Sequence, residues 1–236
     1  WFIMVKCNPI ERSRMLALII LTMSSVVFWA LFEQASASMT LYADRVLDRN
    51  ILGLEMTASQ FGSLNAFFIF VFAPLFAWLW IFLGRRGLEP NTPVKFAMGI
   101  AQAGLGFGAL VIGAATPNEA GMVAGYWMVL AYLLHTTGEL CLSPVGLSAV
   151  TKLSVPSVVG VMMGAWFLAT AYSEFVAVQL AKLAAVETVN GAVTDIGAAL
   201  ASYTALFTNL LYVGLAMAAL LLLLSPLLKK MMHGIH

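Results

Sequence analysis

Charged residues are scarce in this sequence. Of its 236 residues only 10% are charged, whereas 61% are hydrophobic, and the mean hydropathy is +0.93. Because a soluble globular domain carries about a quarter charged residues, the composition excludes that class and predicts an integral membrane protein. The net charge of +1 provides no basic surface for a nucleic acid, so we expect no nucleic-acid partner.

Cysteine is nearly absent as well. Cys7 precedes the first apolar run and Cys141 lies inside a later one, so the two thiols differ in depth and we expect no disulfide. A secretory leader is also missing, because the short apolar start precedes the first basic residues instead of following them. Since the chain begins at Trp1 and not at Met, we expect it to be a segment of a longer protein.

Apolar runs are the main feature that is present. They are too long for the strands of a membrane barrel, and each is long enough to cross a hydrocarbon core of about 30 Å as a helix. We therefore predict an all-α, polytopic membrane protein with a six-helix bundle over residues 14–230, a lead-in over residues 1–13 and a tail over residues 231–236. The predicted spans are about 14–41, 58–83, 94–115, 122–150, 158–182 and 200–228.

Basic residues indicate the orientation of these spans. Three of the 12 Lys and Arg residues, Arg45, Arg49 and Lys182, fall on one side, where acids such as Asp44 and Glu187 accompany them. The other nine fall on the side of the chain ends. Because loops rich in Lys and Arg stay in the cytoplasm, we expect both ends to be cytoplasmic, in an inner or plasma membrane.

One polar stretch lies in the middle of the fourth span. Glu139 has His135 one turn before it and Ser143 one turn after it, and residues four apart share a helix face. The three residues therefore predict one polar stripe. A charge at mid-membrane depth costs at least ~3 kcal/mol, so Glu139 is expected to face a water-filled cavity or the bundle interior and to bind a substrate or an ion.

Two other chemistries could use this stripe. His135 and Glu139 have metal-ligand spacing, but no third ligand follows at a matching distance, so we expect no metal. A hydrolase is disfavoured, because on one helix face Ser143 cannot bond a histidine that the glutamate orients, and no G-x-S-x-G turn surrounds the serine. We therefore expect no enzyme.

Other residues inside the spans have two interpretations each. Glu33 fits a transport role or a structural ion pair with a base outside this chain, and Asn65 fits a ligand or a bond between helices. Trp166 fits the core or a pocket wall. Glu174 and Lys182 favour a structural or rim role, because lysine can reach the outer surface. The prolines at 74 and 144 predict static kinks or flexing points.

Three stretches resemble the C-terminal half of the proton-dependent oligopeptide transporters, a branch of the major facilitator superfamily. They are FWALFEQASASMTLYADR (28–45), RRGLEPNTPVKFAMG (85–99) and GELCLSPVGLSAVTKLSVP (138–156), and the third is the most specific. The resemblance implies that the six spans are the last six helices of a twelve-helix bundle. The implied partners are an N-terminal six-helix half and the lipid bilayer.

The resemblance also implies a substrate site. Glu139 would bind the terminal ammonium of a di- or tripeptide, with Ser143 nearby on the same helix. Asn65 would hydrogen-bond the peptide backbone or carboxylate, and Trp29 and Trp166 would line the pocket.

Coupling and gating residues are implied in the same way. Glu33 is similar to the family's proton-linked acid, which pairs with a lysine of the first half, and Asp44 resembles an outer-gate acid. The implied function is proton-coupled uptake of di- and tripeptides by alternating access, with the proton as coupling ion and no other cofactor. The alternative is a major facilitator half for another solute, a sugar or a drug; a membrane enzyme or a purely structural half is more distant.

Overall fold

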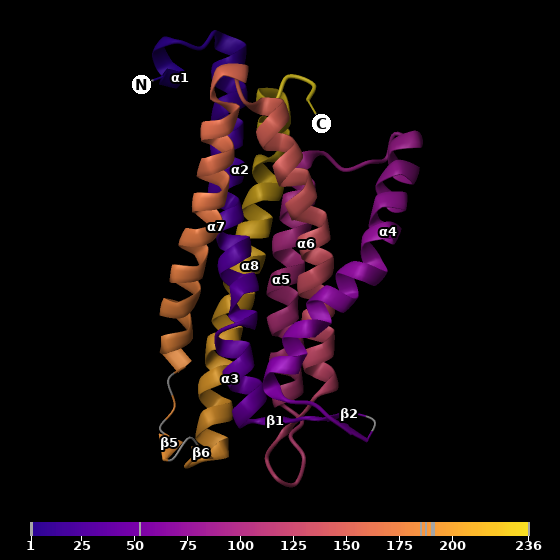
Figure 1. Ribbon diagram of the computed structural model, residues 1–236, viewed down its shortest axis with the longest axis vertical. Helices are drawn as coiled ribbons and strands as arrows, with labels where there is room; N and C mark the ends of the chain where they lie inside the picture. Colours follow the sequence, from indigo (N-terminus) through magenta and orange to yellow (C-terminus); the bar gives the residue numbers. More distant parts are fainter. Residues whose placement is uncertain (1, 52, 185, 187, 190–191, 236) are drawn as a thin grey trace.

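The computed structural model describes residues 2–51, 53–184, 186, 188–189 and 192–235. Glu187 and the outermost residues of the expected lead-in and tail, 1 and 236, lie outside the described residues. In the described part, six long helices run side by side and both chain ends lie at the same end of the bundle (Figure 1). These helices are α2 (Pro9–Phe32), α4 (Ser63–Arg85), α5 (Thr92–Ala114), α6 (Tyr126–Leu153), α7 (Val159–Ala181) and α8 (Ile196–Met231).

Short elements connect the long helices. A four-residue helix, α1 (Phe2–Val5), precedes α2, and α3 (Ser38–Arg45) follows it. Strands of two residues lie in the loops at the end opposite the termini (Figure 1). They form three pairs: β1 (Leu47–Asp48) with β4 (Val123–Ala124) in parallel, β2 (Asn50–Ile51) with β3 (Leu54–Glu55) antiparallel, and β5 (Thr188–Val189) with β6 (Ala192–Val193) antiparallel. Single 3-10 turns are η1 (Glu33–Ala35), η2 (Ala58–Gly62), η3 (Pro156–Val158) and η4 (Lys182–Ala184).

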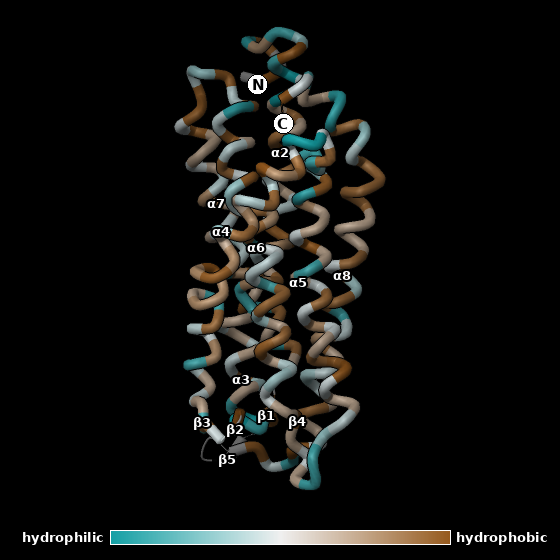
Figure 2. Tube along the Cα trace, turned by 90° about the vertical axis from the view of Figure 1, so that its right-hand side faces the viewer, coloured by the Kyte–Doolittle hydropathy of each residue, from teal (hydrophilic) through white to brown (hydrophobic). Residues whose placement is uncertain are grey.

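Helix lengths and composition agree with the predicted class, an all-α multi-pass membrane protein. Within the described residues, five helical stretches are long and apolar enough to cross a membrane: Pro9–Arg45, Ala58–Arg85, Thr92–Ala114, Pro156–Ala184 and Ile196–Met231. The sixth long helix, α6, has 28 residues and lies among the others, but it carries the polar stretch around Glu139. Hydrophobic residues extend over much of each helix, and hydrophilic residues gather mainly toward the two ends (Figure 2).

The first long helix differs from the expected span at both ends. It begins at Pro9, because Asn8 caps it: the Asn8 Oδ1 accepts a bond from the Glu11 N–H and the Glu11 Oε2 accepts one from the Asn8 N–H, both 2.9 Å. It ends at Phe32, where residues 33–37 interrupt the helix before α3 begins. The apolar run that predicted one span over 14–41 is therefore two helices with a break between them.

Contacts between glycines hold α5 close to its neighbours. A methyl group placed on Gly99 would lie 2.7 Å from the carbonyl oxygen of Gly138 in α6, and one on Gly138 would lie 2.7 Å from that of Gly99. On another face of α5, a methyl group on Gly104 would lie 3.2 Å from the Cα of Gly214 in α8. The glycine-rich sequence of α5 thus permits the close approach of three backbones, as small residues do between membrane helices.

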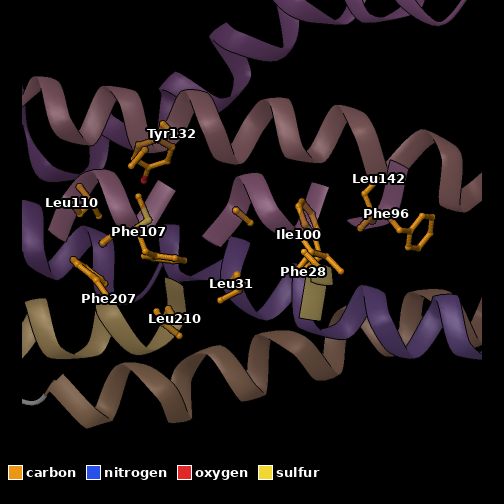
Figure 3. Packing of buried hydrophobic residues seen from close by; sticks show 14 of the residues in the cluster. Phe28, Leu31, Phe96, Ile100, Phe107, Leu110, Tyr132, Leu142, Phe207 and Leu210 are labelled. Carbon is orange, nitrogen blue, oxygen red and sulfur yellow. The ribbon is translucent and has the colours of Figure 1, made fainter. Parts of the chain in front are cut away.

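Aromatic and aliphatic side chains fill the spaces between these helices. Phe107 of α5 packs against Phe207 of α8, with ring centroids 5.5 Å apart, and Ile100 and Phe28 of α2 belong to the same buried cluster (Figure 3). All four side chains are at most 1% exposed. Together with the glycine contacts, this packing makes α2, α5, α6 and α8 the compact part of the bundle.

The remaining long helices, α4 and α7, lie at the margins. In α4, all of which the structure describes, Phe68 is the one buried residue, and in α7 the buried residues are Trp166, Ser173 and Ala177. Toward the end of the bundle that carries the termini, α4 leans away from α5 and α6 (Figure 1). The two marginal helices therefore bury few of their own side chains against the compact part.

The glycine contact between α5 and α6 leads to a stability prediction. Gly138→Ala places a methyl group against the Gly99 carbonyl, where neither backbone can move easily, and overpacking of this kind costs about 1–3 kcal/mol. Gly164→Ala in α7 is the matched control, because a methyl group there meets no atom within 4 Å and alanine favours the helix. We expect thermal unfolding in detergent to occur at a lower temperature for Gly138→Ala only. Equal unfolding temperatures for the two variants would contradict a close contact between α5 and α6.

Candidate functional site

Glu139 lies in a polar cluster between α4 and α6. The Asn65 Nδ2 donates to the Glu139 Oε2 at 3.0 Å and lies 3.1 Å from the Thr136 Oγ1. Thr136 in turn donates to the carbonyl of Tyr132, one turn earlier in α6, at 2.8 Å. The structure therefore brings together two of the residues that the sequence singled out separately, Asn65 and Glu139.

His135 does not belong to this cluster. It is 1% exposed and points toward α5, where a methyl group on Gly106 would lie 2.4 Å from its Cδ2 atom. Its ring packs edge-on against Phe107, with centroids 4.9 Å apart, and neither nitrogen has a hydrogen-bond partner of good geometry among the described residues. The predicted single stripe of His135, Glu139 and Ser143 is thus wrong for His135.

The helix pitch gives the physical reason. Four residues turn a helix about 40° beyond a full turn, so side chains four apart diverge around the helix. In α6, which packs between α4 and α5, this is enough to direct Glu139 to one neighbour and His135 to the other. Ser143 is half-buried in the same helix, next to an exposed Pro144.

Aromatic rings crowd the end of α2 beside the break. Trp29 packs edge-on against Phe28 and Phe32, with centroids 5.2 Å and 5.4 Å away. It is half-buried, and its Nε1–H has no partner among the residues that the structure describes. Phe32 also lies 6.3 Å from the ring of His135. Trp29 therefore carries a buried indole donor for which the described residues provide no partner.

Glu33 occupies the break between α2 and α3. With Ser36 and Glu174 of α7 it lines a hollow of about 280 Å³. The carboxylates of Glu174 and Glu139 are near enough to interact electrostatically with that of Glu33, while no cation bonds Glu33 in the described part of the chain. The site thus gathers three acids around α2, α6 and α7.

Glu174 and Lys182, grouped together on the sequence, are separate in the structure. The Lys182 Nζ donates to the Gln179 Oε1 at 3.2 Å, three residues earlier, whereas Glu174 faces the hollow beside Glu33. Eight residues separate the two in α7 and its continuation, so the lysine reaches a nearer partner. The structural or rim role of the two residues stays a prediction, with Glu174 exposed at the hollow beside Glu33.

Asp44 lies near the end of the bundle opposite the termini. It accepts a bond from the Arg49 Nη1 at 3.1 Å, with 57% of its side chain exposed. The neighbouring Arg45 donates to the Tyr203 hydroxyl of α8 at 2.8 Å, which ties α3 to the compact part of the bundle. Asp44 therefore has a local partner and remains open to a second one.

Trp166 lies inside the bundle. It is 2% exposed and packs edge-on against Phe96 of α5, with centroids 6.2 Å apart. It also fills the space left by Gly146 of α6, where a methyl group would lie 2.2 Å from its ring. In this half of the bundle Trp166 is a core residue, which is one of the two interpretations that the sequence left open, and it braces α6 three residues beyond Ser143.

Two polar clusters were not predicted from the sequence. Gln34 is fully buried beside Glu33: its Nε2 donates to the Ala177 carbonyl of α7 at 3.0 Å, and its Oε1 accepts a bond from Ser38 at 2.6 Å. The signal that could have indicated it is a polar pair, Glu33 and Gln34, followed by four small residues, inside an otherwise apolar run. Gln34 thus ties the break to α7.

The second unpredicted cluster joins α4 to α5 at the end that carries the termini. Lys95 is 7% exposed, forms an ion pair with Glu89, and places its Nζ 4.6 Å from the ring centroid of Trp80. The sequence had indicated Lys95 only as one of the basic residues that set the orientation. A lysine here combines a salt bridge with a cation–π contact, an arrangement that stabilises a partly buried charge.

No group of three or more metal-ligating side chains close together occurs among the described residues. What the arrangement provides is different: a carboxylate at the middle of a membrane helix, an amide donor from a neighbouring helix, and a second acid at a helix break. Fold and site together define a helical membrane protein of the transporter class, with its polar residues gathered where the loosely packed helices meet the compact part.

Comparison with known proteins identifies the family. The model of the POT family matches residues 2–199, and the chain belongs to this family of membrane peptide transporters in the major facilitator superfamily. It is therefore a member of a transporter family and not of an enzyme family.

Individual relatives agree with this assignment. The chain is 39% identical over 230 residues to the uncharacterized transporter YclF of Bacillus subtilis, covering 98% of this chain and 43% of the relative. It is 34% identical over 223 residues to dipeptide and tripeptide permease A of Edwardsiella piscicida, covering 94% and 44%. Its fold matches the crystal structure of the peptide transporter POT in complex with sulfate at 35% identity and a TM-score of 0.83, over 98% and 43%. The chain thus spans less than half the length of these proteins.

Proposed function

We propose that this chain supplies half of a central binding site for the proton-coupled uptake of di- and tripeptides. The observation that carries the proposal is Glu139: a half-buried carboxylate in the middle of α6 whose polar partner comes from a different helix. Relatives named dipeptide and tripeptide permeases support peptides as the substrate class over a sugar or a drug.

The amino end of the peptide is the part that this half is suited to bind. Its ammonium would lie against the Glu139 carboxylate, because a charge-assisted bond of this kind is short and strong. Asn65 and Ser143 would hydrogen-bond the peptide near that end, and the half-buried Trp29 ring would offer an aromatic surface. Trp166 would support the pocket wall from behind by bracing α6.

The carboxylate end of the peptide requires cations that would come from elsewhere. Glu33 and Glu174 are acids, and Glu33 has no cation bonded to it in the described part of this chain. An N-terminal half with six further helices would provide a lysine opposite Glu33 and a basic group for the peptide carboxylate. The share of the relatives' length that this chain covers, 43–44%, supports this division.

Proton movement would drive the uptake. One proton that crosses 100 mV releases about 2.3 kcal/mol, which is enough for roughly 50-fold accumulation of a neutral peptide. Glu33 is the proposed carrier, because it lies at the break between α2 and α3 and shares a hollow with Glu174. The two halves would rock around the site, with both ends of this chain in the cytoplasm and Asp44 at the outer gate.

A first test concerns Glu139. In the full-length transporter, Glu139→Gln should abolish uptake of a labelled dipeptide driven by a proton gradient, because the ammonium loses its counter-charge. Glu119→Gln, which removes an acid from an exposed loop, is the matched control and should leave uptake unchanged. Uptake by Glu139→Gln at the wild-type rate would remove this residue from the substrate site.

A second test concerns Glu33. The Glu33→Gln variant should retain exchange of dipeptide across vesicles loaded with unlabelled peptide, because exchange needs no net proton movement. It should lose the accumulation that a pH gradient drives in the wild-type protein. Gradient-driven accumulation at the wild-type level in this variant would contradict the coupling role.

A further inference from the structure

The marginal helix α4 is attached to the bundle by polar contacts at two levels. Nearer the loop end, the Asn65 amide donates to both Glu139 and Thr136 of α6. Nearer the other end, Trp80 lies over the Lys95 ammonium of α5. Between these two levels only Phe68, which is 9% exposed, is buried in α4. The position of the helix therefore depends strongly on two small sets of contacts.

The stretch between the two attachments contains a point of weakness. Pro74 lies inside α4 and removes a backbone hydrogen bond from the helix. On both sides of it large side chains are exposed, such as Phe70 at 81% and Trp78 at 62%. Close to Pro74, Phe72 is half-buried against the core, so only limited packing opposes a change of angle at this proline.

Glu139, in contrast, sits on the fixed side of this contact. Gly138, its neighbour in α6, touches Gly99 of α5 backbone to backbone. Two residues further along, Cys141 accepts a bond from the Gln102 amide of α5 at 3.4 Å. If the bond between Asn65 and Glu139 opens, α4 is the helix that moves.

The strength of this bond depends on the charge of its acceptor. A neutral amide donates more strongly to a carboxylate than to a neutral oxygen. A ligand ammonium that pairs with Glu139 competes for the negative charge of the carboxylate, which stays ionised, and so weakens the bond from Asn65. The freed Asn65 amide is then available to the peptide backbone.

We propose that the bond between Asn65 and Glu139 is a latch that the substrate's ammonium releases. Without a peptide, the latch holds the outer part of α4 against α6; with the ammonium on Glu139, α4 is released and pivots about Pro74. Asn65 is thus a positioning residue that converts occupancy of the site into movement of a helix. Release of α4 by the peptide ammonium rests on the proposed function, whereas the attachment of α4 by Asn65 in the absence of peptide does not.

The test is a distance measurement in the full-length transporter. Spin labels on Phe70→Cys, in the outer part of α4, and Tyr212→Cys of α8, both more than half exposed, report the distance of that part from the compact part, with Cys7 replaced by serine. Addition of a dipeptide should shift the wild-type distance distribution by several ångström. Asn65→Leu should show the shifted distribution without peptide and no further change when peptide is added.

Two further variants separate the latch from a merely structural role. Thr136→Val removes the second acceptor of the Asn65 amide but keeps the bond to Glu139, so if that bond is the latch the variant should keep the wild-type peptide-free distribution and the shift on peptide addition. Glu139→Gln keeps a neutral acceptor in a side chain of the same size, so its peptide-free distribution should move in the direction that the dipeptide causes. If both Asn65→Leu and Glu139→Gln show the same peptide-free distance distribution as the wild-type protein, the proposed latch is wrong.

Failure of the proposed function has a different signature. If calorimetry detects no dipeptide binding to the wild-type protein, the substrate assignment is wrong. The comparison of the peptide-free wild-type and Asn65→Leu proteins still decides whether Asn65 holds α4, because it involves no ligand.

Discussion

A carboxylate halfway along a membrane helix is the constraint on which the rest of this structure depends. Removing such a charge from water is costly, so Glu139 requires a hydrogen-bond donor, a water-filled cavity or a counter-charge at all times. The bundle provides one donor, the Asn65 amide, from a helix that is otherwise loosely held. This leaves the carboxylate only partly satisfied and able to attract a ligand cation, which is a reason to keep an acid at that depth.

The packing of the bundle follows from the same need. A binding residue must be held firmly if its partner is to move, and α6 is held by glycine contacts with α5, which in turn lies against α8 in the same way. The helices that present polar groups to Glu139 and Glu33, α4 and α7, have few buried residues. The closely packed helices are thus different from the loosely packed ones, and the candidate site lies between the two groups.

Much of this could be predicted from the sequence, and the misses have physical causes. Long apolar runs predict the class, and an acid at mid-span predicts a site at Glu139. Periodicity of four could not separate His135 from Glu139, because their directions diverge slowly and only the neighbouring helices decide what each side chain meets. The break at Glu33 was missed because residues 14–41 read as one apolar run. The buried position of Trp166 depends on Gly146 of another helix, which no local pattern reveals.

The most direct test of the central claim is whether Glu139 recognises the amino end of a peptide. The measurement is the binding affinity of a dipeptide and of its N-acetylated form for the full-length wild-type and Glu139→Gln proteins. If the carboxylate binds the ammonium, acetylation should weaken binding to the wild-type protein about tenfold or more, a loss of about 1.4 kcal/mol, and should change binding to the variant little. An equal loss in both proteins would show that the ammonium is bound elsewhere and would contradict the account.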